Sequence, residues 1–346
     1  MTHDEQYMHR CLQLAALGLG PTAPNPLVGA VLVHQGSIIG EGYHKQYGHA
    51  HAEVNCIDSV PSHEQQFIPH STLYVNLEPC AHVGKTPPCA DFIIAKGIKE
   101  VVIANLDPFI KVDGKGIEKL QAAGVLVRTG ILEHEASILN KRFLCFHTKH
   151  RPYIILKWAQ SANGFISGPQ GDPLKISNEI SDRFVHRWRS EEAAILVGTN
   201  TAAIDNPNLT NRLWTGNSPV RVVLDKNLRL AQTLNLFHGG RTVVLNFLKS
   251  ELVGSAEFVI INEQVGLPSA ICEALSALSI QSVLVEGGTQ LLNSFIDSGI
   301  WDEARVIVNK KMVIDDGIKA PHLFNASKTD ATEEGSDLIS TYIPIL

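Results

Sequence analysis

Short apolar runs alternate with helix-patterned segments along this chain, and the alternation begins twice. From residue 1 to about residue 145, strand-like runs such as GAVLVHQG, STLYVNLEP and EVVIAN are separated by segments with helical spacing, among them HAEVNCIDSV, GIEKLQAAG and EHEASILNKRF. Strand runs that alternate with helices predict a layered α/β domain whose sheet is largely parallel.

The stretch CFHTKHRPY interrupts this pattern, and the apolar periodicity restarts directly after it with YIILKWA. Because domain boundaries fall in polar, proline-containing segments, we expect one domain over residues 1–146 and a second over 152–346. The second half again alternates strands and helices, and its acidic segment KTDATEEGSD is predicted to be a solvated turn before a terminal edge strand. No internal repeat relates the halves, so two different α/β modules are expected.

The composition argues against several classes of function. Apolar residues make up 44% of the chain and charged residues 18%, the balance of a folded globular protein. A formal net charge of −6 gives no electrostatic reason to expect a nucleic-acid or membrane surface. The N-terminus lacks the pattern of a secretory signal and no apolar run approaches about 18 residues, so we expect a cytoplasmic protein without a membrane span. Six cysteines in a reduced compartment favour a metal site over a disulfide framework.

One group of residue types predicts such a metal site. HAE places His51 and Glu53 two positions apart at the start of a predicted helix, and PCAHVGKTPPC places Cys80 and Cys89 after a predicted strand. Zinc would take the imidazole and both thiolates and leave a fourth position for water, whose pKa it lowers toward 7. Glu53 would stay off the metal and carry a proton to a departing amine, which is hydrolytic deamination. The usual zinc deaminase spacing is P-C-x-x-C, so the longer insert in this chain is distinctive.

PNPLVGAVLV, GEGYHKQYGHAHAE and NLEPCAHVGKTPPCADFIIAKGI resemble the deaminase domain of the bifunctional pyrimidine deaminase/reductase family of riboflavin biosynthesis. The resemblance implies a cytidine-deaminase-like fold, a phosphoribosylamino-diaminopyrimidine as substrate, and zinc on His51, Cys80 and Cys89 with Glu53 as the catalytic proton carrier. It also implies substrate contacts from Asn25, His44, His82 and Lys85. The family often has arginine at this last position, and a lysine offers a point charge in place of a fork of donors.

The second half carries a weaker signal for a nucleotide site. It has no G-x-G-x-x-G motif, but in SVLVEGGTQLLNSFI a Gly-Gly turn joins a buried-type strand to a helix, whose N-terminal amides favour an anion. ILVGTNTAAIDNPNLTNR adds a polar loop after another buried-type strand. An ordinary tight turn is the alternative interpretation of the two glycines.

RPYIILKWAQSANGFIS, FVHRWRSEEAAILVGTNTAAIDNPNLTNR and VLVEGGTQLLNSFIDSGIWDEARV resemble the reductase domain of the same family. The resemblance implies a dihydrofolate-reductase-like fold that uses NADPH. The cofactor contacts that it implies fall on Ala159, Thr201, Asp205 and Gly288. The implied substrate contacts fall on Arg189, Leu209, Arg212 and Glu286.

Two positions of this half depart from the family pattern. Asn163 stands where the family commonly has aspartate in S-x-D-G. Either an acid that assists proton transfer has been replaced by an amide, or the residue only shapes a turn, for which asparagine serves equally well. Lys175 stands where some members have a tryptophan, so a stacking contact is expected to be missing. His186 and Trp188 fit a half-buried helix face and are assigned no functional role.

The sequence therefore predicts a bifunctional enzyme that deaminates a small phosphorylated pyrimidine with Zn²⁺ and then reduces its ribosyl chain to a ribityl chain with NADPH. We expect a homo-oligomer that binds neither nucleic acid nor membrane. One alternative is a zinc deaminase with an inactive or altered C-terminal reductase domain. A second is a deaminase of nucleosides or nucleic acid, against which the net charge and the long cysteine spacing argue. A third is a non-catalytic zinc-stabilised assembly module, which leaves Glu53 unexplained.

Overall fold

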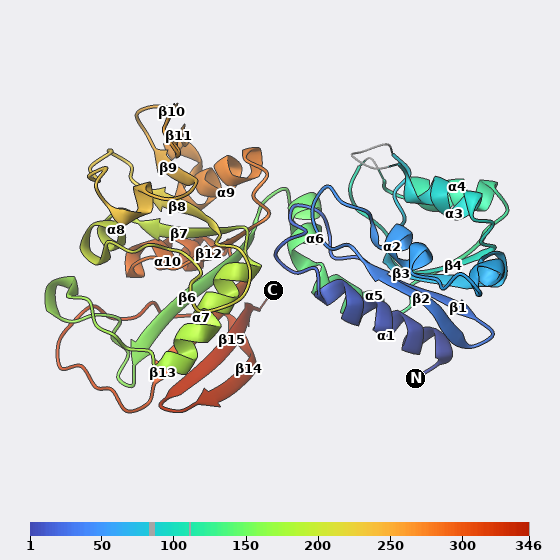
Figure 1. Cartoon of the computed structure of the whole chain (residues 1–346). Coiled ribbons are helices and arrows are strands. Elements are labelled where there is room, and N and C mark those ends of the chain that lie inside the picture. The colour runs from blue at the N-terminus through green and yellow to red at the C-terminus, as the bar shows by residue number, and fades with distance from the viewer. Residues whose placement is uncertain (83–86, 111, 346) are drawn as a thin grey trace. The chain divides into compact units, whose positions relative to one another are not determined.

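The computed structural model describes residues 1–82, 87–110 and 112–345, and the chain divides into two compact units, Met1–His150 and Arg151–Leu346. Both units are α/β structures, as Figure 1 shows. No helix of the described residues is long and apolar enough to cross a membrane.

The first unit is built on a five-stranded sheet with the order β2-β1-β3-β4-β5. The bounds of its strands are β1 (Gly29–His34), β2 (Ser37–Tyr43), β3 (Thr72–Leu77), β4 (Glu100–Asn105) and β5 (Leu126–Thr129). Strands β3, β4 and β5 are parallel, whereas β1 is antiparallel to both β2 and β3. The expectation of a largely parallel sheet is therefore correct for only half of the pairings. The two-residue turn Gln35–Gly36, with positive φ at both positions, reverses the chain into the β1–β2 hairpin.

Helices cover both faces of this sheet. Their bounds are α1 (His3–Ala16), α2 (Ala52–Asp58), α3 (Cys89–Ala95), α4 (Lys115–Ala122), α5 (Glu133–Leu139) and α6 (Lys141–Lys149), with a 3-10 helix η1 at Gln65–His70. Figure 1 shows α2, α3 and α4 on one face and α1 and α5 on the other. Alternate residues of β1 supply both cores, because Ala30 and Leu32 pack under α2 and α3 while Val31 and Val33 pack under α1.

Two features of this unit differ from, or refine, what the sequence pattern predicts. The helix expected through EHEASILNKRF is interrupted at Asn140, whose amide pairs with the backbone of Leu27 through bonds of 2.8 and 2.9 Å. The glycine of GAVLV is required by packing: a Cβ on Gly29 would lie 2.1 Å from the carbonyl oxygen of Cys11 on α1. The helix can approach β1 this closely only over a glycine.

The second unit contains a ten-stranded sheet with the order β10-β11-β9-β8-β7-β12-β6-β13-β15-β14. The strand bounds are β6 (Tyr153–Ser161), β7 (Ala194–Gly198), β8 (Val220–Leu224), β9 (Thr242–Asn246), β10 (Glu251–Val253), β11 (Ala256–Ile260), β12 (Ser282–Val285), β13 (Glu303–Asn309), β14 (Ala326–Glu334) and β15 (Asp337–Pro344). Strands from β11 through β13 in this order are parallel, and the outer pairings are antiparallel.

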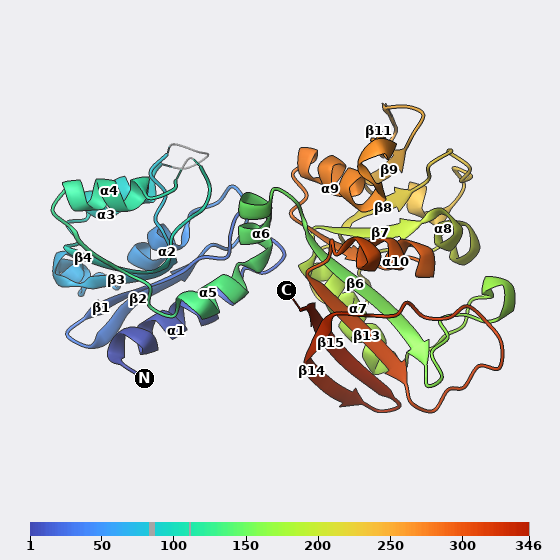
Figure 2. The same cartoon turned by 180° about the vertical axis from the view of Figure 1, so that it is seen from behind.

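The helices of the second unit are α7 (Glu179–Glu191), α8 (Thr199–Asp205), α9 (Leu267–Ala277) and α10 (Thr289–Ser298), with 3-10 helices η2 (Pro169–Gly171), η3 (Asn235–Phe237) and η4 (Glu263–Val265). Figure 2, which views the chain from behind, shows α10 in front of this sheet and α7 on its far face. The parallel strands are almost continuous apolar runs, such as Ile195–Val197 and Val283–Val285, because both of their faces are buried.

The C-terminal segment differs from its prediction. The acidic residues do not form a solvated turn: they belong to β14, an exposed strand at the edge of the sheet. The more apolar β15 lies inside, paired with both β13 and β14. Asp337 at its start is fully buried and accepts hydrogen bonds from the backbone of Asn178 and the hydroxyl of Ser181, and these bonds tie the hairpin to the first turn of α7.

Candidate metal centre and cofactor cavity

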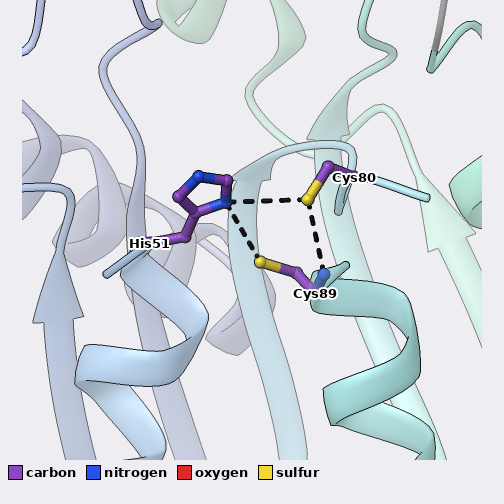
Figure 3. A group of neighbouring side chains, drawn as sticks. All are labelled: His51, Cys80 and Cys89. Carbon is purple, nitrogen blue, oxygen red and sulfur yellow. Dashed lines mark hydrogen bonds between the residues drawn. The ribbon is translucent and has the colours of Figure 1, made fainter. Parts of the chain in front are cut away.

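Three metal-ligating side chains meet in the first unit (Figure 3). The Nδ1 atom of His51 lies 3.2 Å from Sγ of Cys89 and 3.6 Å from Sγ of Cys80, and the three ligand atoms all lie within 4.8 Å of one another. One nitrogen and one sulfur ligand at zinc distances and a tetrahedral angle lie about 3.6 Å apart. The three side chains therefore fit a single zinc ion.

The loop between the two cysteines is closed at its ends by hydrogen bonds. The backbone N–H of Cys89, the first residue of α3, donates to Sγ of Cys80 at 3.3 Å, and the next N–H, of Ala90, donates to the carbonyl of Cys80 at 3.1 Å. The hydrogen bond from the Cys89 thiol, together with His51, lowers the pKa of the Cys80 thiol. The nine-residue spacing thus still delivers both sulfur atoms to one point, with a thiolate favoured at Cys80.

Glu53 lies beside this cluster in the first turn of α2, whose N-cap is His51. Its side chain is buried, and its Oε2 atom has no hydrogen-bond partner in the described structure. Burial, and then the negative charge of Cys80, raise the pKa of Glu53. A buried carboxyl oxygen without a partner next to three metal ligands is a group available to exchange protons.

The predicted pyrimidine contacts Asn25, His44 and His82 lie in the same unit. Nδ2 of Asn25 lies 3.1 Å from Nε2 of His44, whose ring is 5.3 Å from that of His51 between centroids. The Nδ1 atom of His82 is buried and has no hydrogen-bond partner among the described residues, and the ring stacks edge-on with Phe109 at 5.8 Å. Asn25 and His44 are therefore brought to the cluster, whereas the predicted contact Lys85 lies outside the described residues.

Glu78 is a buried residue of this region that the sequence did not single out. Its two carboxylate oxygens accept hydrogen bonds from the backbone N–H groups of Asp107, Gly114, Gly116 and Ile117. A Cβ on Gly116 would lie 2.0 Å from the carbonyl oxygen of Pro79, so α4 packs directly on the strand end that carries Cys80. In the sequence, the position of this glutamate directly before the Pro-Cys pair was the signal that could have identified it.

A cavity of about 970 Å³ opens in the second unit at the carboxyl ends of β6, β12, β7 and β8. Ligands of open parallel sheets bind at this edge. Five of the predicted site residues line it: Ala159, Thr201, Asp205, Glu286 and Gly288. A Cβ on Gly288 would lie 3.3 Å from Oγ1 of Thr201, so the glycine keeps open a narrow part of the cavity at the start of α10.

A buried charge cluster lies beside the cavity. Arg189 on α7 donates two hydrogen bonds to Glu286, of 3.0 and 2.8 Å, and the ammonium group of Lys157 lies 3.8 Å from the same carboxylate. Burial opposes the ionised form of Glu286, but Arg189 and Lys157 outweigh it and lower the pKa of Glu286 to about 2. Burial lowers the pKa of Lys157. Glu286 and Lys157 line the cavity wall, and Arg189 holds the carboxylate of Glu286 through its two hydrogen bonds without lining the wall itself.

The structure does not bring the side chains of the other two predicted substrate contacts to the cavity wall. Leu209 is 3% exposed, with positive φ, and packs in the core around β7 and β8. Arg212 is exposed, with a hydrogen bond of 3.1 Å from Nη1 to the hydroxyl of Thr210.

The two departures from the family pattern also have defined places. The amide of Asn163 donates to the carbonyl of Ile314 at 2.8 Å and accepts from its N–H at 3.2 Å, so both of its polar atoms hold a neighbouring loop. A carboxylate could make only the second of these bonds. Lys175 lines the cavity and pairs with Asp182 at 3.3 Å.

Comparisons with known proteins agree with the two units. Residues 1–105 match the family described as the cytidine and deoxycytidylate deaminase zinc-binding region, and residues 152–325 match the RibD C-terminal domain. The riboflavin biosynthesis protein RibD of Aquifex aeolicus is 40% identical over 317 residues, which cover 90% of this chain and 88% of that protein. RibD of Bacillus amyloliquefaciens is 38% identical, covering 99% and 96%. This chain belongs to the RibD family.

A solved structure agrees with this assignment to the RibD family. The diaminohydroxyphosphoribosylaminopyrimidine deaminase/5-amino-6-(5-phosphoribosylamino)uracil reductase of Thermotoga maritima superimposes with a TM-score of 0.89 at 35% identity and covers 99% of both chains. The predicted family, the two-domain α/β fold class, the pairing of a deaminase with a reductase and the cofactors Zn²⁺ and NADPH are confirmed. The alternative of a deaminase with an inactive reductase is not favoured.

Further residues of the RibD-type cavity were missed in the sequence. Lys226, Asn227 and Arg229 line its wall directly after β8. Asp225 shapes this turn, because its carboxylate accepts from the N–H of Leu230 at 2.9 Å. The available signal was the polar run DKN directly after the buried strand VRVVL, since residues that follow parallel strands meet at one edge of the sheet.

Proposed function

We propose that this chain deaminates a phosphoribosylamino-diaminopyrimidine in residues 1–146 and reduces the deaminated product with NADPH in residues 152–346. One observation carries the proposal: three zinc-ligating atoms converge beside a buried carboxyl oxygen of Glu53 that has no hydrogen-bond partner in the part of the chain that the structure describes. That combination suits catalysis better than a structural metal site, which closes with a fourth ligand.

In the deaminase unit, His51, Cys80 and Cys89 would hold the zinc ion. The ion supplies Lewis-acid activation of water near neutral pH. Glu53 takes a proton as water attacks the pyrimidine carbon and passes it to the amine, which leaves as ammonia. Burial raises the pKa of Glu53 and so brings it closer to the working pH, which suits a group that must both accept a proton and return it.

Substrate contacts in this unit are proposed for Asn25, His44, His82 and Lys85. Nδ1 of His44 lies 3.0 Å from the carbonyl of Ala50, which fixes the ring beside Asn25, so the pair can read a polar edge of the pyrimidine. His82 offers a buried nitrogen that no described group satisfies. Lys85 would supply a positive charge for the phosphate.

In the reductase unit, NADPH would lie along the carboxyl ends of the parallel strands and supply a hydride. Gly288 and the N-terminus of α10 suit its diphosphate. Thr201 and Asp205 on α8 line the same cavity and would also contact the cofactor. Ala159 on β6 is proposed to contact its nicotinamide end. Arg189, Leu209, Arg212 and Glu286 are proposed for the substrate. Lys157 and Ala159 on β6 line the same cavity as Glu286, which follows the adjacent strand β12, so the two proposed binding sites would adjoin one another.

The cations after β8 lead to a prediction about cofactor choice. Strands β6 and β8 are separated by β12 and β7, so their ends lie about 14 Å apart at normal strand spacing. A dinucleotide with its nicotinamide at β6 would extend toward Lys226 and Arg229. We expect the double variant K226Q/R229Q to raise the KM for NADPH by about tenfold to a hundredfold and to leave the KM for NADH unchanged, because the 2′-phosphate loses charge-assisted hydrogen bonds.

Steady-state kinetics with the two cofactors measure this effect. The control is K310Q, which removes an exposed lysine of the same unit that pairs with Glu333. Equal losses with NADPH and NADH would contradict the assignment of these two residues.

We further propose that the protein is a cytoplasmic homo-oligomer. Cys80 and Cys89 must stay reduced to serve as zinc ligands, as a reducing compartment would maintain them. Strand β10 is at the sheet edge and carries Leu252, which is 73% exposed, so a second copy could cover an apolar edge there. Light scattering at micromolar concentration measures the assembly, and a monomer would contradict it.

Mass spectrometry of the product tests the function directly. Incubation of the phosphoribosylamino-diaminopyrimidine with the zinc-loaded protein should add about one mass unit as an amine is replaced by oxygen. Addition of NADPH should add about two more as hydride and proton are taken up. A first change without the second would support a deaminase with an inactive reductase, and no change in either sample would overturn the proposal.

A further inference from the structure

His186 on α7 is a buried polar residue that the proposed reaction does not use. It is 5% exposed, and its Nδ1 atom accepts a hydrogen bond of 2.9 Å from the backbone N–H of Arg212. The imidazole can make this bond only when Nδ1 carries a lone pair, that is, in its neutral form with the proton on Nε2.

A second side chain of α7 holds the same loop. Nη1 of Arg189 donates to the carbonyl of Thr210 at 3.3 Å, and Arg189 is itself fixed by its two bonds to Glu286. His186 and Arg189 are three positions apart and therefore lie on one face of the helix. The backbone of residues 210–212 is thus docked on α7 at two points, one N–H and one carbonyl.

Within this loop the side chain before residues 210–212 is buried, whereas Arg212 and the residues that follow it are exposed. Leu209 anchors the entry to the loop in the core, 3% exposed. The guanidinium group of Arg212 is exposed and has one described hydrogen bond, to the hydroxyl of Thr210. Its other donors can therefore reach a ligand, and their direction depends on the position of the Arg212 backbone.

We propose that His186 is a positioning residue of the reductase, which holds Arg212 for the phosphate of the substrate through its neutral imidazole. The proposal rests on the function proposed above for Arg212. Protonation of the imidazole replaces the acceptor with a second donor that faces the N–H of Arg212. The loop would then lose one of its two attachments to α7, and the substrate would bind less tightly.

The charges around His186 set the direction of the pH dependence. Burial, followed by the positive charges of Arg189 and Arg212, lowers the pKa of His186 below its ordinary value of 6.5, while Glu286 and Asp182 act in the opposite direction. The neutral form is therefore kept at neutral pH. The attachment is complete above pH 6.5 and is lost as the pH falls through the lowered pKa.

Two variants separate this role from a purely structural one. In H186N the amide oxygen occupies the position of Nδ1, accepts the same bond and does not titrate, whereas H186A removes the acceptor. At pH 8 we expect H186A to raise the KM for 5-amino-6-(5-phosphoribosylamino)uracil about tenfold, as expected for loss of one buried hydrogen bond, with H186N close to wild type. As the pH falls from 8 through the lowered pKa of His186, the KM should rise more steeply for wild type than for H186N, because the phosphate of the substrate takes up a proton in both but the imidazole does so only in wild type.

Controls identify which claim fails if the results differ. H238N changes an exposed histidine of the same unit and should leave all constants unchanged. R212Q should raise the same KM, and an unchanged KM there would overturn the phosphate role of Arg212. A raised KM in R212Q with an unchanged KM in H186A, or an H186N profile that rises in acid as steeply as that of wild type, would overturn the role of His186. The unfolding temperature of the second unit reports whether each variant is folded.

Discussion

Glu53→Gln should reduce deamination by about a thousandfold or more while the zinc content stays at one ion per chain. The amide keeps the shape of the side chain but cannot accept and return a proton, and general acid–base groups contribute about a hundredfold to ten-thousandfold to rates. Glu53 is absent from the cluster of His51, Cys80 and Cys89 that fits the ion, so metal binding does not depend on it. Ammonia release and elemental analysis measure the two quantities.

Two further variants serve as controls for this result. Glu118→Gln changes an exposed glutamate of the same unit and should leave deamination intact. Cys89→Ser should lose both zinc and deamination. Reduction of the deaminated product with NADPH should persist in Glu53→Gln, since that activity is placed in the other unit. Deamination at an undiminished rate in Glu53→Gln, or loss of its zinc, would contradict the role proposed for the carboxylate.

Arg189→Met should lower the unfolding temperature of the second unit by about 6–20 °C. The substitution leaves the carboxylate of Glu286, now with Lys157 alone, buried beside an apolar side chain, and removal of one partner of a buried ion pair costs about 3–5 kcal/mol. In domains of this size each kcal/mol corresponds to about 2–4 °C. Scanning calorimetry measures the shift, with the transition of the first unit as an internal reference.

Arg187→Met on the same helix is the matched control. Arg187 pairs with Glu191 at 2.8 Å, but its side chain is 48% exposed, so the pair is screened by water and little change is expected. A similar shift in both variants would contradict the assignment of a buried pair. The wild-type stabilisation should also depend on pH: because the pKa of Glu286 is lowered to about 2, it is present above about pH 4.5 and lost as the pH falls toward 2.

Much of the metal centre could be predicted because its parts are local. His51 at a helix start, Cys80 after a strand and Cys89 at the next helix start are each set by a few neighbouring residues, and the structure has all three where the pattern predicts them. The strands and helices of both units were predictable for the same reason. The hairpin of β1 and β2 was also predictable, but the antiparallel pairing of β1 with β3 was not, because periodicity describes which face of a strand is buried and not which strand lies beside it.

The C-terminal hairpin shows the same limit. The acidic composition of β14 suggested a turn, yet pairing with β15 makes it a strand, since an edge strand can expose most of its side chains. Lys226 and Arg229 were missed because their importance depends on four strand ends that converge from distant parts of the chain.

The sequence by itself determined the chemistry available to this protein: one imidazole, two thiolates and a carboxylate at the spacing of a zinc deaminase, and a glycine turn before a helix that suits a dinucleotide. The tertiary structure alone decided which charges pair and which loops are held. Arg189 and Glu286 are 97 residues apart, and His186 reaches the backbone of Arg212 only because α7 packs beside that loop. Such contacts depend on how elements pack together, and packing joins residues that no local pattern relates.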